Sequence, residues 1–241
     1  MIKHYLKVAF RNLIKYKTQS LVSIIGLAVG FTCFALSVLW IRYEMTYDNF
    51  HEGADRIYLV RAHYANEPGT SKFTPYPLMK YLQDKMPEIE AVTAFTAHYV
   101  KFRMEDTEQE IGMIAADSVF MNFFDIQLLK GTVNFLKCDG QEVAITKEFA
   151  KRLFSKEEDA LGKEVEVGRR VCKIGAIVSG WSNHSNIPYN ILAPARHSPQ
   201  WGSSNEQLLI RVRERTDIDA FRTKMSTVCI NDIEKESELS D

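Results

Sequence analysis

The longest apolar segment of the chain runs from Ser20 to Ile41 and contains neither a charged residue nor a proline. At about 1.5 Å of rise per helical residue, a segment of this length matches a hydrocarbon core of roughly 30 Å. A soluble helix of this length normally keeps a polar face, and a cleavable signal peptide has a shorter apolar region that ends at small residues. Bulky Trp40 and charged Arg42 stand at the end of this segment instead. The pattern therefore predicts one uncleaved membrane-spanning helix over 18–42.

Beyond this helix, the pattern switches to short alternating runs and amphipathic turns, which predicts strands and helices in one α+β domain. Helices are expected after Thr74, Asp117 and Thr146 and over 217–233. Strand, helix and strand follow one another at the start of the domain, which favours a split βαβ unit. The strands are expected at 57–64, 89–104, 108–115, 142–145, 163–167, 171–178, 189–192 and 207–212.

The formal net charge of −1 hides an uneven distribution, because Met1 to Tyr43 contains basic residues and no acidic one. Acidic residues follow steadily from Glu44 onward. Short flanks rich in Lys and Arg stay in the cytoplasm under the positive-inside rule. The N-terminus is therefore expected inside, and the chain after Arg42 outside.

A repeat of four basic residues precedes the spanning helix, at Lys3, Lys7, Arg11 and Lys15. Residues four apart lie on one side of a helix, so the pattern predicts an amphipathic cytoplasmic helix over 1–17. At the inner membrane surface each basic residue gains about 1 kcal/mol against anionic lipid, which makes membrane lipid an expected partner. A simple cytoplasmic extension of the spanning helix fits the same spacing.

Within the spanning helix, Gly26 and Gly30 form a G-x-x-x-G, and Ser23 lies on a nearby face. Small residues at this spacing let two helices approach closely. The pair therefore predicts packing against another transmembrane helix, although glycines also occur at this spacing by chance.

The chain lacks the motifs of common enzyme classes. No G-x-x-x-x-G-K-[ST] phosphate loop occurs, so this chain is not itself expected to be an ATPase, and no cofactor is expected in it. The absence of G-x-S-x-G, H-E-x-x-H and C-x-x-C argues against the hydrolase, zincin and thiol-redox classes. His184 in a polar loop is a weak candidate for proton transfer, and His51, His63, His98 and His197 lack metal-ligand spacing. The sequence therefore predicts that the protein is not an enzyme.

Three cysteines follow the spanning helix, at Cys138, Cys172 and Cys229. An oxidising compartment would permit one disulfide among them at most. Cys172 alternates with apolar residues and Cys229 lies four residues after Met225, so both are expected in the core. Acidic residues interleave with the arginines over 211–215, and nucleic acid is not an expected partner.

Several short motifs occur in the order found in one family of membrane proteins. The first are Phe10-Arg11-Asn12-Leu13 and Ile24-Ile25-Gly26-Leu27. The later ones are Asp55-Arg56-Ile57-Tyr58, Phe123-Phe124, Leu129-Lys130-Gly131, Val143-Ala144-Ile145-Thr146, Ala150-Lys151-Arg152-Leu153-Phe154 and Leu161-Gly162-Lys163. Over nearly the whole chain they resemble bacterial FtsX-like ABC-transporter permeases with a MacB-like periplasmic core domain.

The resemblance implies a MacB-like periplasmic core domain over 43–241. In such domains a βα sheet module, here 55–104 and 205–241, is interrupted by an inserted mixed α/β subdomain, here 105–200. The resemblance also implies the bacterial inner membrane as the location, and further transmembrane helices, because similar permeases have four per unit.

The resemblance further implies a permease subunit of an ABC transport system. Its cytoplasmic ABC ATPase partner hydrolyses ATP and thereby moves the periplasmic domain for export or mechanotransmission. A second permease copy, in a homodimer or a heterodimer, and a periplasmic adaptor or outer-membrane partner are also expected. The alternative function is a single-pass, membrane-anchored periplasmic domain that binds or senses a ligand.

Overall fold

The computed structural model divides the chain into two compact units, Met1–Tyr47 and Asp48–Asp241. The expectations for Cys138, His184 and His51 lie outside the residues that the structure describes. The described residues are 2–46, 53–64, 68–104, 107–137, 141–181, 185, 187–229 and 232–233.

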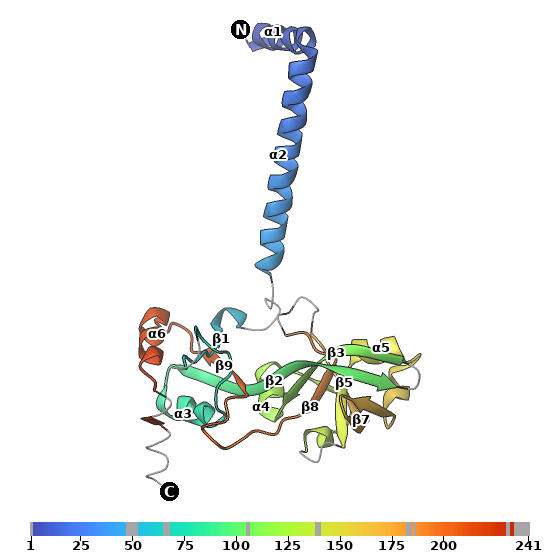
Figure 1. The fold of residues 1–241 in the computed structure, drawn as a ribbon, viewed down its shortest axis with the longest axis vertical. Helices are drawn as coiled ribbons and strands as arrows, with labels where there is room; N and C mark the ends of the chain where they lie inside the picture. Colours follow the sequence, from blue (N-terminus) through green and yellow to red (C-terminus); the bar gives the residue numbers. More distant parts are fainter. Residues whose placement is uncertain are drawn as a thin grey trace. The chain divides into compact units, whose positions relative to one another are not determined.

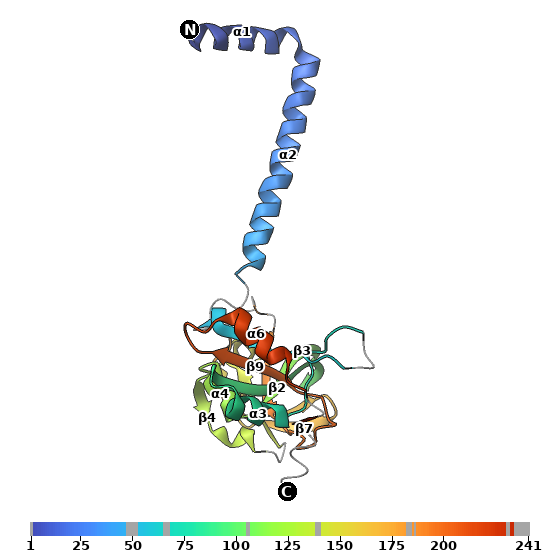
Figure 2. The same cartoon turned by 90° about the vertical axis from the view of Figure 1, so that its left-hand side faces the viewer.

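The first unit consists of two helices, α1 (Ile2–Lys15) and α2 (Lys17–Glu44). They are separated at Tyr16, whose φ of −107° and ψ of 57° lie outside the helical region. Figures 1 and 2 show α1 bent away from α2 at this point. A helix is present over the expected 18–42 and extends beyond it at both ends, and its passage through a membrane stays a prediction. The break therefore separates the basic segment from the apolar one.

The second unit contains one mixed sheet of nine strands, in the order β1-β9-β2-β3-β8-β5-β7-β4, with β6 pairing with β2 and β7. Every expected strand is present, and the α+β class is confirmed. The first strand is shorter than the expected 57–64, because Ala62 pairs with Ser71 in a turn instead. The strands are β1 (Ile57–Leu59), β2 (Ile89–Met104), β3 (Thr107–Ala116), β4 (Leu128–Gly131), β5 (Glu142–Thr146), β6 (Glu164–Val167), β7 (Arg170–Val178), β8 (Ile191–Pro194) and β9 (Gln207–Val212).

Side-chain caps start three helices of this unit at the residues that the sequence predicts, Asp117, Thr146 and Asp217. Asp117 Oδ1 accepts a hydrogen bond from Phe120 N at 3.0 Å, and Thr146 Oγ1 accepts one from Phe149 N at 3.3 Å. These caps satisfy N–H groups that the first helical turn leaves unpaired. The helices are α3 (Pro77–Lys85), α4 (Ser118–Phe123), α5 (Lys147–Leu153) and α6 (Ile218–Ser226), with the 3₁₀ helices η1 (Ala54–Arg56), η2 (Val133–Leu136) and η3 (Glu157–Ala160).

Six of the strands close into a ring, in the order β2, β3, β8, β5, β7 and β6. The strand β6 closes it by pairing with β7 on one side and with Phe102 and Arg103 of β2 on the other. Closure removes the long free edges of an open sheet, and side chains fill the interior. There Phe102 meets Phe149 of α5, with 5.1 Å between ring centroids. Figure 1 shows β3, β5 and β7 of the ring together with α5 at one end of the unit.

The 16-residue strand β2 continues beyond the ring, where it pairs with β9, which in turn pairs with β1. Helices α3 and α6 pack on this part, and Leu82, Val92 and Phe221 belong to their common core. Successive side chains of a strand point to opposite faces, so Phe95 enters a different core. There it packs against Phe120 of α4, with 5.2 Å between ring centroids.

The division of 43–241 into a module of 55–104 with 205–241 and an insertion of 105–200 stays a prediction. The strands β1, β9 and the first half of β2 lie together, whereas β3 and β6 pair with its second half. One strand therefore contributes to both parts.

The last helix is shorter than the expected 217–233, because α6 ends at Ser226. Hydroxyl groups bond to carbonyl groups near this end. Ser226 Oγ donates to Thr223 O at 2.7 Å, and Thr227 Oγ1 donates to Lys224 O at 2.7 Å. Such local bonds compete with continuation of the helix, which explains the early end.

A buried charged cluster joins the starts of α3, α4 and β9. His197 lies between β8 and β9, with Nε2 3.6 Å from Asp117 Oδ2 and Nδ1 3.3 Å from Glu206 Oε1. These are ion-pair contacts rather than well-directed hydrogen bonds. The imidazole also stacks on Tyr76, with 4.1 Å between ring centroids and 5° between the planes. Only 12% of the His197 side chain is exposed, so the charges interact away from bulk water.

This environment shifts three pKa values. Burial lowers the pKa of His197, but its contacts with Asp117 and Glu206 outweigh burial and raise the pKa to about 9. Burial works to raise the pKa of Asp117, yet His197 and the Phe120 N–H hold it below its ordinary value. Burial, followed by the two carboxylate charges, raises the pKa of Tyr76. His197 is therefore protonated at neutral pH and compensates both carboxylates.

The variant His197→Gln should lose a pH-dependent part of the stability. Because the folded-state pKa of about 9 lies above the ordinary 6.5, the charge stabilises fully below pH 6.5, and this is lost as pH rises through 9. The wild type should lose about 2 to 3 kcal/mol of unfolding free energy over this window, and the variant less than about 1 kcal/mol. Urea denaturation of the detergent-solubilised chain, followed by tryptophan fluorescence, measures this difference.

Asp117→Asn is a second test of the same ion pair, because asparagine keeps the helix cap and removes the charge. It should also reduce the pH dependence of the unfolding free energy. If the unfolding free energy of both variants depended on pH as that of the wild type does, His197 would not be the titrating group.

Candidate functional site

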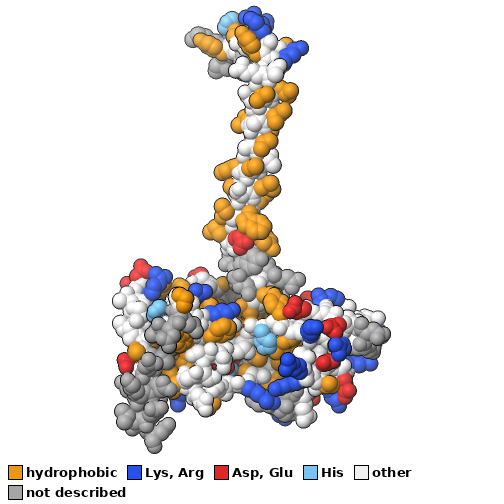
Figure 3. All heavy atoms as spheres, in the orientation of Figure 1, with side chains coloured by type: hydrophobic (Ala, Val, Ile, Leu, Met, Phe, Trp, Pro, Cys, Tyr) orange, Lys and Arg blue, Asp and Glu red, His pale blue; other side chains and the backbone are white. Residues whose placement is uncertain are grey.

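Helix α2 presents apolar side chains on its whole circumference. None of its 28 residues is buried, and Leu27 is 76% exposed. Figure 3 shows hydrophobic side chains in orange along this helix. The hydroxyls of Thr32 and Ser37 donate to the carbonyls of Ala28 and Cys33, each at 2.8 Å, and are satisfied as hydrocarbon requires. Among the described helices, α2 is the one that is long and apolar enough to cross a membrane.

Gly26 and Gly30 lie one turn apart on α2. A Cβ atom built on either glycine meets no atom within 4 Å. Their common face is therefore open along the described chain and flat enough for a second helix. The role of this pair in packing stays a prediction.

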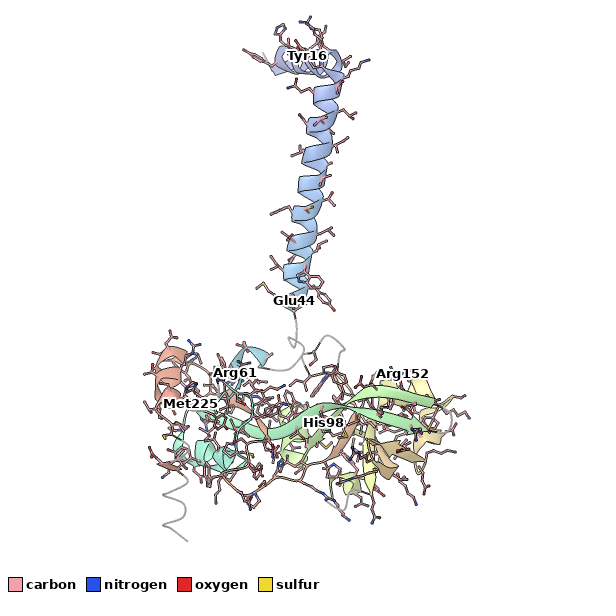
Figure 4. The ribbon with its side chains drawn as sticks, viewed as in Figure 1. Tyr16, Glu44, Arg61, His98, Arg152 and Met225 are labelled. Atoms are coloured by element: carbon pink, nitrogen blue, oxygen red, sulfur yellow. The ribbon has the colours of Figure 1, made fainter. Side chains whose placement is uncertain are left out.

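The four residues of the predicted basic face all belong to α1. The side chains of Lys7, Arg11 and Lys15 are exposed, and that of Lys3 lies outside the described part. Figure 4 labels Tyr16 where α1 meets α2. Because the helix is interrupted there, α1 is a helix separate from the apolar α2. That α1 lies on a membrane surface stays a prediction.

One end of the six-stranded ring opens into a cavity of about 400 Å³, here called the ring mouth. The strands β5 and β7 begin at this end, whereas β3, β8 and β6 finish there, so their terminal residues surround the opening. The ring mouth is therefore assembled from most of the ring. Its apolar lining includes Val100, Met113, Val143, Val167 and Cys172.

The rim of the ring mouth is basic. Arg169 and Arg170 come from the turn between β6 and β7, where Gly168 adopts a φ of +65°. Arg196 follows β8, and His98 belongs to β2. Figure 4 labels His98, and Figure 3 shows Lys and Arg side chains in blue on the same face. No Asp or Glu occurs among the described lining residues, so the local charge is positive.

No motif or spacing in the sequence indicates the ring mouth. The nearest signal was the alternation around Cys172, whose expected burial is confirmed at 6% exposure. The expectation for Cys229 is wrong, because α6 ends before it and leaves this side chain exposed. The described cysteines Cys33, Cys172 and Cys229 form no disulfide with one another.

The described histidines have separate environments. His63 places Nδ1 2.7 Å from Gly69 O, His98 lies at the ring mouth, and His197 belongs to the charged cluster. Within the described ranges, no three His, Cys, Asp or Glu side chains are close enough together to hold a metal ion. The buried cluster of His197 is held by its ion pairs with Asp117 and Glu206.

Comparison with known proteins places this geometry in a family. The profile of the MacB-like periplasmic core domain matches residues 20–228. Among curated proteins, none matches significantly. A domain of a protein named as a permease from Porphyromonas gingivalis is 21% identical, with a TM-score of 0.57 over 70% of this chain and 81% of that one.

Two further solved structures share the fold. The extracellular domain of the noncanonic ABC-type transporter YknZ from Gram-positive bacteria is 15% identical, with a TM-score of 0.51 over 68% of this chain and 86% of that one. The periplasmic region of MacB from Actinobacillus actinomycetemcomitans is 12% identical, with a TM-score of 0.50 over 76% and 92%. The family profile covers most of the sequence, and these solved structures share the fold of this chain. The chain therefore belongs to the family of the MacB-like periplasmic core domain.

Proposed function

We propose that this chain is the N-terminal part of a permease subunit of an ABC transport system. The subunit couples ATP hydrolysis by a cytoplasmic partner to movement of its periplasmic domain, for export or mechanotransmission. The observation that carries this proposal is the succession of an unburied apolar helix and a MacB-like periplasmic core domain in one chain. The similar domain of an ABC-type transporter supports the same assignment.

The charge distribution supports an orientation with the N-terminus in the cytoplasm and the second unit in the periplasm. Basic residues precede α2, and the first acidic residue of the chain is Glu44 at its end. This is the asymmetry of the positive-inside rule. The break at Tyr16 favours α1 as a separate helix on anionic lipid, where each basic residue gains about 1 kcal/mol.

The proposed activity requires partners. A cytoplasmic ABC ATPase supplies ATP binding and hydrolysis, because this chain contains no phosphate loop. Gly26 and Gly30 offer a flat face to a helix of a second permease copy, in a homodimer or a heterodimer. A periplasmic adaptor or outer-membrane partner receives the movement.

A single-pass, membrane-anchored domain that binds or senses a ligand is the second candidate function. The ring mouth favours it, because concave apolar cavities with a few polar groups are typical of ligand sites. The two candidates differ in their need for an ATPase.

Purification of the tagged chain from its native membranes tests the proposed function. In mild detergent, an ATPase subunit with a phosphate loop should co-purify, and the complex should hydrolyse ATP. An unrelated single-span protein with the same tag is the control. Purification of the chain without any ATPase would support the anchored binding domain instead.

Replacing both Gly26 and Gly30 by Leu should impair assembly in the membrane, because the added side chains keep helices apart. We expect the assembled fraction on a native gel to fall at least about tenfold, which corresponds to about 1.4 kcal/mol. The matched control is Ala28→Leu with Thr32→Leu, the same spacing on the opposite side of α2. Equal loss in both pairs would contradict a specific role for the glycines.

Thiol labelling tests the orientation, because Cys229 is exposed in the second unit. In a variant that retains only this cysteine, a membrane-impermeant maleimide should label intact spheroplasts. A cysteine introduced by His4→Cys in α1 of the cysteine-free chain should be labelled only after lysis. The opposite pattern would reverse the proposed topology.

A further inference from the structure

We infer that the ring mouth binds a small amphiphile with one carboxylate head and a short acyl tail. The cavity of about 400 Å³ lies within the range of about 300 to 1,000 Å³ that is typical of small-ligand sites. Its walls carry Val100, Met113 and Val143, which offer an apolar surface to a hydrocarbon tail. The size and the apolar walls of the cavity therefore fit a short hydrocarbon tail of the ligand.

The basic rim indicates the charge of the ligand's head group. An arginine side chain presents a planar fork of donors that matches a carboxylate in geometry and charge. Arg103, on the outside of the ring, already pairs with Glu108 and Glu166. Arg169 and Arg170, in contrast, have no carboxylate partner among the described residues. Their charges are therefore available to an anionic group at the opening.

The hairpin backbone holds the two arginines at the opening. Val167 pairs with Arg170, so Gly168 and Arg169 form a two-residue turn. The φ of +65° at Gly168 suits glycine, which adopts this conformation without steric cost. Gly168 N also donates to Lys101 O of β2 at 2.7 Å, which anchors the turn to the ring. The backbone positions of both arginines are thus fixed before a ligand arrives.

The closed ring favours a small ligand over an acidic peptide. An extended peptide binds a sheet most readily by adding a strand to a free edge. Every strand of the ring has a neighbour on both sides, so no long edge is available at the ring mouth. A compact carboxylate needs only the rim and the cavity, which the ring supplies.

Photolabelling of the full chain in phosphatidylcholine nanodiscs tests this inference. The probe is a decanoic acid with a diazirine at the end of its tail. We expect adducts on Met113, Val143 or Cys172, and unlabelled decanoate should compete for them. Among competitors shorter than decanoate, affinity should rise about three- to fourfold for each added methylene group. Decyltrimethylammonium, with the same tail and the opposite charge, should not compete.

Two variants test the binding of the carboxylate head and of the acyl tail separately. Arg169→Gln with Arg170→Gln should lower labelling at least about tenfold, because charge-assisted hydrogen bonds to the carboxylate are lost. Ala115→Leu should lower it by filling the cavity, since Ala115 lines the ring mouth. Arg222→Gln on α6 is the matched control and should label as the wild type does.

Adducts confined to α2, or equal competition by decyltrimethylammonium, would overturn the inference. Loss of labelling with a glutamate-rich peptide but not with decanoate would also overturn it and assign the ring mouth to a protein partner. The measurement requires no ATPase, so its outcome is independent of the proposed transport function.

Discussion

Backbone pairing along β2 holds the second unit together, because this strand contributes to all three of its hydrophobic cores. Its first residues pair with β9, and its last residues pair with β3 and β6. Since side chains alternate between faces, Phe95 enters one core while Val92 and Phe102 enter the two others. Buried backbone groups require partners, so a break in β2 would open the ring and the sheet that carries α3 and α6.

The two units follow different physical constraints. In hydrocarbon every backbone polar group must be satisfied within the segment, and α2 meets this requirement as one continuous helix of 28 residues. Such a helix is suited to transmit a displacement, which the proposed coupling to an ATPase requires. In the second unit, ring closure leaves an apolar cavity open at one end, and Arg169 and Arg170 give that end its charge. The proposed transport and the inferred ligand binding therefore depend on separate features.

Much of the fold follows from local patterns in the sequence. The bounds of β2 and β9 agree with the predicted strands at 89–104 and 207–212, because runs rich in aliphatic, β-branched and aromatic residues between turn segments indicate strands. The caps at Asp117 and Thr146 are predicted because capping acts within three residues. The apolar segment of α2 is predicted equally well, since a candidate membrane span is recognised from its length and composition. The candidate membrane residues on α1 and α2 come from such patterns too.

The sequence by itself determined these features because each depends on neighbours a few residues apart. Only the tertiary structure decided the closure of the ring, the basic ring mouth and the early end of α6, which exposes Cys229. It also decided the partners of His197, for which the sequence shows only that metal-ligand spacing is absent. Asp117 and Glu206 reach this histidine because β8, β9 and α4 converge around it. Contacts of this kind join residues far apart in the chain, and no local periodicity encodes them.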